Sequence, residues 1–299
     1  MTITAAKTVS ELCLMNNRYE ERNVNVKKQD FDLTIKENLG LSSEKYLDKP
    51  YDYYFNKPEF EKFKAEMKKS FPEAYKSFDF GKGGEMEETL RNDKVLPPKM
   101  ASVASSSRFA YLALRNGVSA IGGGNVVFEH PCKIEGVRGI PPQMDAYSSA
   151  GNIFIEVKCH EIFDKHKIII KTKYKEKLED FGLFISGEGE KVEIPLSEFD
   201  IKKETSMFDI KQLLCHLMGV KSHSNGDRAT LLYLFFKPQN EKYQNEIDSV
   251  FEELKSEIKT IFESKPIKKF CNSQITLKAV CQTGKIMQAL KDDNIEVLY

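Results

Sequence analysis

The sequence predicts an α/β protein whose mixed central sheet is flanked by helices, with a mostly helical extension before it. From residue 105 onward, short apolar runs typical of strands alternate with amphipathic segments typical of helices. Residues 1–100 are instead polar and rich in Lys and Glu. The chain has 299 residues, which suffices for a sizeable core. We therefore expect an N-terminal helical extension and linker over 1–100, and the core over 101–299.

The extension is expected to contain an amphipathic helix. Within residues 57–75, large apolar side chains recur at helical spacing, at Phe60, Phe63, Met67 and Phe71. Residues 78–100 are bounded by a Gly-Lys-Gly-Gly stretch and a Pro-Pro pair, so we interpret them as a linker with a short helix. The first residues lack a positive segment followed by an apolar one, so we expect no signal peptide.

The first half of the core is predicted to be a helix followed by three strands. The helix covers 105–116, because serines at its start are N-cap residues and Gly117 follows its end. The strands cover 125–135, 143–147 and 152–159, and are rich in β-branched and aromatic residues. A Ser-Ser-Ala-Gly-Asn turn joins the last two strands into a hairpin.

The second half of the core begins with an ambiguous segment at 164–182, whose pattern fits a strand or a helix. An amphipathic helix is expected at 207–219 and a buried apolar strand at 228–237. The remaining elements are a long amphipathic helix at 240–265, a strand at 273–282 and a short helix at 284–293.

Composition excludes few function classes. The chain has 45 basic and 45 acidic residues, so its net charge favours neither nucleic acid nor basic partners, and a polyanion site requires local clustering. None of the six cysteines has C-x-x-C spacing, so we expect reduced, mostly buried thiols in a cytoplasmic protein. The longest apolar run, at 231–236, is far too short for a membrane span, so no membrane partner is expected.

Asp145, Glu156 and Lys158 form the motif with the clearest chemistry. Side chains two residues apart on a strand share a face, so Glu156 and Lys158 are neighbours. In a hairpin, Asp145 on the preceding strand can lie opposite them. Two carboxylates close together suit Mg²⁺, which prefers oxygen ligands and retains waters. A nearby ammonium can polarise a bound water and stabilise charge growing on a phosphate.

The spacing of an Asp, ten residues and then Glu-x-Lys resembles the PD-(D/E)xK nuclease superfamily, whose fold is restriction-endonuclease-like. The resemblance covers about residues 100–240, where the expected order of helix, three strands, helix and strand is that of the superfamily core. Uncharacterised bacterial members are similar in the segments SSSRFAYLAL, VFEH, MDAY, IEVKCHE and DIKQLLCHL. Met144 stands where the superfamily's name has Pro. The resemblance implies a restriction-endonuclease-like core.

The resemblance also implies roles for acidic residues around the motif. By it, Asp145 and Glu156 bind Mg²⁺, for which Mn²⁺ can substitute, and Lys158 assists the attacking water. Glu129 and Glu161 add outer-sphere or second-metal contacts. The implied reaction is metal-assisted hydrolysis of a phosphodiester bond.

Residues outside the motif are expected to orient the site or to contact DNA. Gln212 and His216 lie four apart and share a helix face, from which they orient the site or touch a phosphate. Lysines spaced by two in 165–177 would lie on one strand face beside a polyanion groove, and backbone amides at a helix start could hold a phosphate. The residues expected to contact nucleic acid are Lys165, Lys167, Lys171, Lys173, Ser106 and His216.

Each of these residues also has a purely structural interpretation. Glu156 and Lys158 could form a surface ion pair on an edge strand, which would stabilise the protein little. Glu129 could be a solvated strand residue, and His216 a hydrogen-bonded histidine of the core. Gln212 sits in an otherwise apolar helix, and the lysines could simply be a solvated face. Serines 105–107 could serve only as a helix cap.

The leading hypothesis is a Mg²⁺-dependent deoxyribonuclease, with DNA as its substrate and a homodimer as one arrangement that such enzymes adopt. The balanced charge motivates a second hypothesis, a non-catalytic module of the same fold that binds nucleic acid or another partner. A third is a metal-dependent hydrolase of a different phosphate substrate.

Overall fold

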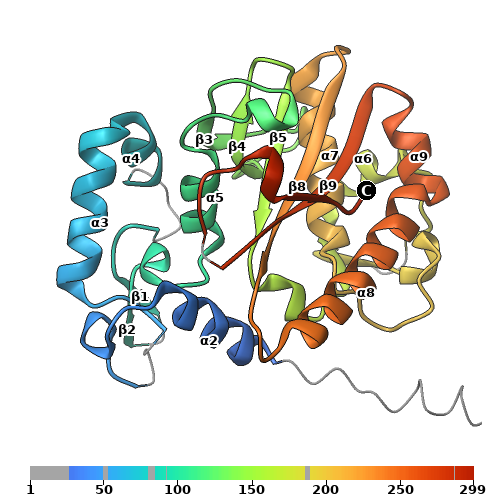
Figure 1. The fold of residues 1–299 in the computed structure, drawn as a ribbon. Helices are drawn as coiled ribbons and strands as arrows, with labels where there is room; N and C mark the ends of the chain where they lie inside the picture. Colours follow the sequence, from blue (N-terminus) through green and yellow to red (C-terminus); the bar gives the residue numbers. More distant parts are fainter. Residues whose placement is uncertain (1–26, 50–52, 80–84, 92, 186–188, 286) are drawn as a thin grey trace, which may run out of the picture.

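A six-stranded mixed sheet forms the centre of the protein (Figure 1). The computed structural model describes residues 27–299 except 50–52, 80–84, 92, 186–188 and 286. Across the sheet the strands follow the order β10, β9, β8, β5, β4, β3. They are β3 (Val127–Pro131), β4 (Gln143–Ser148), β5 (Ile153–Lys158), β8 (Ala229–Pro238), β9 (Ile275–Gly284) and β10 (Ile295–Val297). β8 pairs in parallel with both β5 and β9, and the other pairs are antiparallel.

Helices cover both faces of this sheet (Figure 1). Tyr233 and Phe236 lie three apart on β8, so their side chains point to opposite faces. The ring of Phe236 contacts Phe109 of α5 (Ser106–Leu114), with 5.2 Å between centroids. Tyr233 contacts His216 of α7 (Ile210–Ser224) and Phe262 of α8 (Gln244–Glu263) on the other side. The α/β class and the mixed sheet flanked by helices are thus confirmed.

Most of the expected core elements are confirmed within a few residues of their predicted ends. β4, β5, β8, β9, α5, α7 and α8 all lie where the apolar pattern placed them. β3 is shorter than the predicted 125–135, because Pro131 cannot donate a ladder hydrogen bond and the chain turns at Ile134–Val137, where the N–H of Val137 bonds the carbonyl of Ile134.

The ambiguous segment at 164–182 contains both kinds of structure. It holds β6 (Ile168–Lys171), which pairs with β7 (Lys191–Ile194) in a separate two-stranded sheet, and then α6 (Lys175–Glu179). Strand geometry covers only four residues here, so the lysines at 165–177 do not share one strand face as expected.

The short helix predicted at 284–293 is wrong. β9 runs to Gly284, and residues 287–291 have no regular secondary structure before a 3₁₀ turn at Asp292–Asn294, after which β10 pairs with β9. The N–H of Leu290 donates to the carbonyl of Ala113, 2.9 Å away, and Met287 is buried. Tertiary contacts have therefore overridden a local helical preference.

The N-terminal part is helical but more divided than expected. The predicted helix at 57–75 is two helices, α3 (Lys57–Ser70) and α4 (Pro72–Asp79), because a proline disfavours helical geometry in the residue before it. Where a linker was predicted, β1 (Thr89–Arg91) and β2 (Lys94–Leu96) form a hairpin, followed by a 3₁₀ turn at Lys99–Ala101.

This part packs against the core. The guanidinium of Arg108 on α5 stacks on the rings of Phe55 and Phe63, at 4.1 and 4.6 Å from their centroids. The first described helix, α2 (Lys28–Leu39), packs Phe31 edge-to-face on Phe163, directly after β5.

Two sequence expectations concern the chain as a whole. The described cysteines are free, and all but the partly exposed Cys215 are buried, as predicted, while Cys13 lies outside the described residues. No described helix combines the length and apolarity needed to cross a membrane.

Candidate active site

The hairpin of β4 and β5 brings the two motif carboxylates together. Ala146 pairs with Ile155 across this hairpin, so the register places Asp145 opposite Glu156. β5 lies between β4 and β8, in the interior of the sheet. Both carboxylates and Lys158 line one cavity of about 400 Å³ at the end of these strands.

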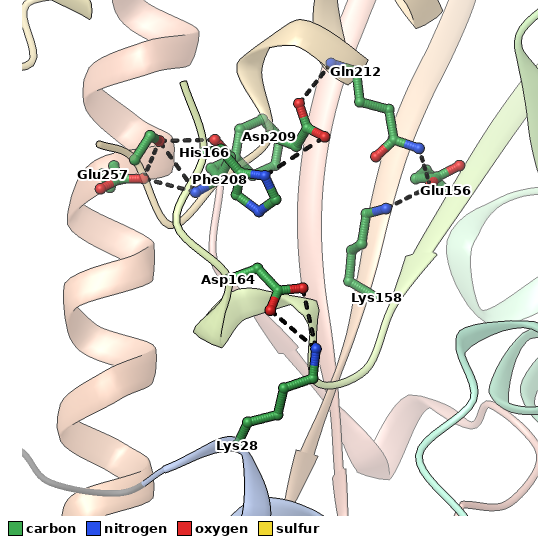
Figure 2. Close-up of polar contacts among 10 residues, drawn as sticks. Lys28, Glu156, Lys158, Asp164, His166, Phe208, Asp209, Gln212 and Glu257 are labelled. Carbon is green, nitrogen blue, oxygen red and sulfur yellow. Dashed lines mark hydrogen bonds and ion pairs between the residues drawn. The ribbon is translucent and has the colours of Figure 1, made fainter. Parts of the chain in front are cut away.

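Direct hydrogen bonds order the motif side chains. The Nζ of Lys158 and the Nε2 of Gln212 both donate to Oε1 of Glu156, at 2.7 and 2.8 Å (Figure 2). Oδ2 of Asp145 accepts the backbone N–H of Val157 at 2.7 Å. Glu156 is only 4% exposed, so this is not the solvated ion pair of an edge strand.

Glu129 completes a row of three acids across neighbouring strands. Phe128 pairs with Ala146 and His130 with Met144, so Glu129 lies opposite Asp145. Its backbone has a φ of 52°, a left-handed conformation that is costly for Glu and that recurs at functional sites. Glu129 lines the cavity and is not a fully solvated strand residue.

Burial and mutual repulsion change the ionisation of these acids. Burial raises the pKa of Glu129 to about 7, and the charges of Glu85 and Glu156 add to this effect. Burial likewise raises the pKa of Asp145 well above its ordinary value, with further repulsion from Glu156. Without a bound cation, burial and repulsion thus favour the protonated forms of both acids.

Lys158 keeps its charge in this environment. Burial alone would lower its pKa, but the surrounding carboxylates, Glu156 and Glu161 foremost, raise it above the ordinary value. The ammonium therefore remains protonated and available to a negatively charged group in the cavity.

The N-terminal part supplies a cavity wall that the sequence did not predict. Glu85, only 7% exposed, accepts hydrogen bonds from the Ser107 hydroxyl at 2.7 Å and from the Lys99 ammonium at 2.9 Å. All three residues line the cavity, together with Ser106. Glu85 and Lys99 lie in the segment interpreted as a linker, and no local pattern marks them, because only the tertiary fold brings them to the strands.

Glu161 and His160 form the rim that follows β5. Oε2 of Glu161 accepts the N–H of Cys159 at 2.7 Å, which turns this side chain back toward the motif. His160 bonds Asp32 of α2 through its Nδ1, 2.6 Å away. Both line the cavity.

The donor set fits a hard cation with few protein ligands. Within the residues that the structure describes, no group of three or more His, Cys, Asp or Glu side chains is arranged to hold a metal ion. Mg²⁺, however, commonly uses one or two carboxylates and keeps several waters. Asp145 and Glu156 supply two carboxylates on facing strands, and burial, followed by repulsion from Glu156, raises the pKa of Asp145.

The start of α7 positions Gln212. Asp209 caps the helix by accepting the N–H of Gln212 at 2.9 Å, and its other oxygen lies 3.7 Å from Nδ1 of His166 (Figure 2). Glu257 of α8 holds the residues before this cap, since its Oε1 accepts the Ser206 hydroxyl at 2.5 Å and the Phe208 N–H at 2.8 Å. A chain of hydrogen bonds thus fixes where the Gln212 side chain meets Glu156.

We expect Glu257→Leu to destabilise the protein by about 1–3 kcal/mol, because the buried Ser206 hydroxyl and Phe208 N–H lose their carboxylate acceptor and keep only the hydrogen bonds between these two residues. Glu257→Gln retains an acceptor oxygen and should keep most of the stability. Chemical denaturation measures the free energy of unfolding. Glu252→Leu on the exposed face of the same helix is the control, and equal stability of the two Leu variants would contradict the expectation.

The remaining predicted site residues lie away from the cavity. His216 is 1% exposed, bonds the Tyr233 hydroxyl at 3.2 Å and lies 3.7 Å from Glu156, so its side chain is enclosed in the core beside Glu156 and does not line the cavity. The predicted lysines are exposed but do not line the cavity, and Lys173 donates to the carbonyl of Arg138. These lysines are Lys165, Lys167, Lys171 and Lys173.

Comparisons with protein-family models, with curated proteins and with solved structures gave no match to this chain. The geometry of the cavity is therefore the basis for assigning a function.

Proposed function

We propose that this chain is a Mg²⁺-dependent nuclease that hydrolyses DNA phosphodiester bonds. The observation that carries the proposal is the meeting of Asp145, Glu156 and Lys158 in one solvent-connected cavity, on adjacent strands of a sheet interior. Burying three ionisable side chains in a sheet interior lowers the stability of the fold, and such clusters are typical of functional sites. The order α5, β3–β5, α7, β8 is also compatible with the core that the resemblance to PD-(D/E)xK nucleases implies.

Each side chain has a role that follows from its surroundings. Asp145 and Glu156, with Glu129 beside them, would hold Mg²⁺ or Mn²⁺, which supplies a Lewis acid for the phosphate and lowers the pKa of a bound water. Lys158 stays protonated and stabilises negative charge that develops on the phosphate. Gln212 fixes the orientation of Glu156 through its 2.8 Å hydrogen bond.

The wall at the start of α5 offers a phosphate the Ser106 hydroxyl and the remaining N–H groups of Lys99. The Ser107 hydroxyl is bonded to Glu85. Ser106 and Ser107 stand in the first turn of α5 and line the cavity, where the positive end of the helix dipole favours an anion. Lys99 is largely exposed and carries a positive charge on the same wall. An acidic centre for the cation, bordered by donors and ammonium groups for the substrate, is the arrangement that phosphodiester hydrolysis requires.

Plasmid and linear DNA incubated with purified protein test the proposal. We expect cleavage with Mg²⁺ or Mn²⁺ and none with a chelator. Without a divalent cation, Glu129 and Asp145 favour their protonated forms, and any ionised carboxylate in the cavity repels the phosphate. Gel electrophoresis of the products over time measures the rate. Cleavage that is unaffected by chelator would contradict a metal-dependent site.

A second candidate is a non-catalytic module of the same fold that binds nucleic acid or another partner, because the balanced net charge does not by itself attract a polyanionic substrate. Salt-dependent DNA binding without turnover in any divalent cation would favour it over the enzyme. Hydrolysis of small phosphodiesters but not of DNA would indicate a different phosphate substrate.

A further inference from the structure

A second cavity, of about 220 Å³, adjoins the candidate active site. The two cavities share Lys158, Glu161 and Gln212 as common walls. The parallel pairing of β5 and β8 places Tyr233 beside Glu156 and Phe235 beside Lys158 on the same face of the sheet. The second cavity therefore lies directly next to the catalytic groups, over β8 instead of β4.

The lining of this cavity differs in character from that of the active site. Its floor is apolar and aromatic, formed by Phe208, Tyr233 and Phe235, which are 3%, 1% and 1% exposed. Met207 is half-buried and stands at the edge. Polar groups, among them His166, Asp164 and Asp209, complete the wall. Metal-assisted hydrolysis at Asp145 and Glu156 uses none of these residues.

The cavity is held in shape by contacts outside it. Glu257 fixes the backbone of Phe208 from α8, and the ring of Phe208 packs edge-to-face on Tyr233 at 4.8 Å. On the opposite rim, the carboxylate of Asp164 is bonded by the ammonium of Lys28 on α2, at 3.0 and 3.1 Å (Figure 2). A preformed cavity that combines an aromatic floor with polar groups in its wall is typical of small-molecule sites.

We propose that this cavity binds one unpaired nucleobase of the strand whose phosphate occupies the active site. A nucleotide joins an anionic phosphate to a flat aromatic base. The two cavities match these two parts, because the candidate active site can bind the phosphate and the adjoining cavity, which shares Lys158 with it, has an aromatic floor. Aromatic side chains bind bases by stacking whatever the sequence, and polar edges add hydrogen bonds. A cavity of this volume admits a single base and not a base pair. The substrate is thus single-stranded or locally unpaired DNA, an inference that rests on the proposed nuclease function.

Binding of a mononucleotide tests the cavity separately from catalysis. Calorimetry with Mg²⁺ compares 2′-deoxyadenosine 5′-monophosphate with 2-deoxyribose 5-phosphate, which lacks the base. We expect the nucleotide to bind at least about tenfold more tightly. Met207→Trp should fill the cavity and remove this difference without changing the affinity for the sugar phosphate. Met207→Ala, which keeps the cavity open, should retain the difference.

Cleavage of oligonucleotides gives a second readout. Single-stranded substrates should be cut at least about tenfold faster than fully paired duplexes by the unmodified protein and by Met207→Ala, and at similar rates by Met207→Trp. Metal-dependent cleavage together with equal binding of nucleotide and sugar phosphate would overturn the base site and leave the nuclease standing. Base-dependent binding without any cleavage would overturn the nuclease and retain the base site.

Discussion

Asp145→Asn is expected to reduce DNA cleavage by at least about a thousandfold while leaving the protein folded. The amide cannot supply the negative charge that a divalent cation requires, but its oxygen can still accept the N–H of Val157. Glu156→Gln should have the same effect on cleavage, since the two acids face each other across the hairpin. Initial rates on plasmid DNA in Mg²⁺ measure the loss.

The matched control for this prediction is Asp227→Asn, which makes the same chemical change at an exposed position after α7. It should cleave at the unmodified rate. Circular dichroism and thermal unfolding confirm that Asp145→Asn is folded. If both active-site variants keep cleaving, the nuclease centre lies elsewhere and the role assigned to this cavity is wrong.

Glu129→Gln is expected to stabilise the metal-free protein by about 2–3 kcal/mol at pH 8 and by little at pH 4.5. The pKa of Glu129 in the folded protein is about 7, above its ordinary value of 4.5. Below pH 4.5 the acid is protonated in the folded and unfolded states alike, so it costs nothing. As the pH rises toward 7, the unfolded chain loses this proton and the folded chain keeps it, so stability falls. The glutamine side chain does not ionise in this pH range, so the variant does not lose this stability as the pH rises.

The measurement is the free energy of unfolding by chemical denaturation at several pH values, with chelator present so that no cation neutralises the acids. Glu135→Gln, at an exposed position on the loop after β3, is the control and should leave the pH profile unchanged. A Glu129→Gln variant whose advantage is the same at pH 4.5 and pH 8 would show that Glu129 is not the group that titrates.

The central elements could be predicted from the sequence because their patterns are local. β-branched and aromatic side chains and a glycine-containing turn predict the β4–β5 hairpin, and the register of that hairpin sets Asp145 opposite Glu156. Gln212 is a polar residue among the buried apolar residues of α7, and this position in the helix predicts that it orients the site.

Residues brought in by long-range contacts could not be predicted. Glu85 reaches Ser107 through folding of a segment that has no strong periodic pattern. The short helix at 284–293 fails for a similar reason, because a backbone hydrogen bond from Leu290 to Ala113 decides its conformation. The strand face of lysines fails because β6 ends at Lys171, where the chain enters a helical turn.

The position of β5 in the sheet also bears on how the chain avoids misassembly. β5 pairs locally with β4 in the hairpin, but its second neighbour, β8, begins only at Ala229. During folding, the β5–β8 pairing is therefore expected to form after the hairpin. Until then its apolar edge is open to pairing with other molecules. Glu156 and Lys158 interrupt that apolar run with charge, which discourages intermolecular pairing. Glu156 and Lys158 therefore place charge on the strand edge that stays open until β8 pairs with it.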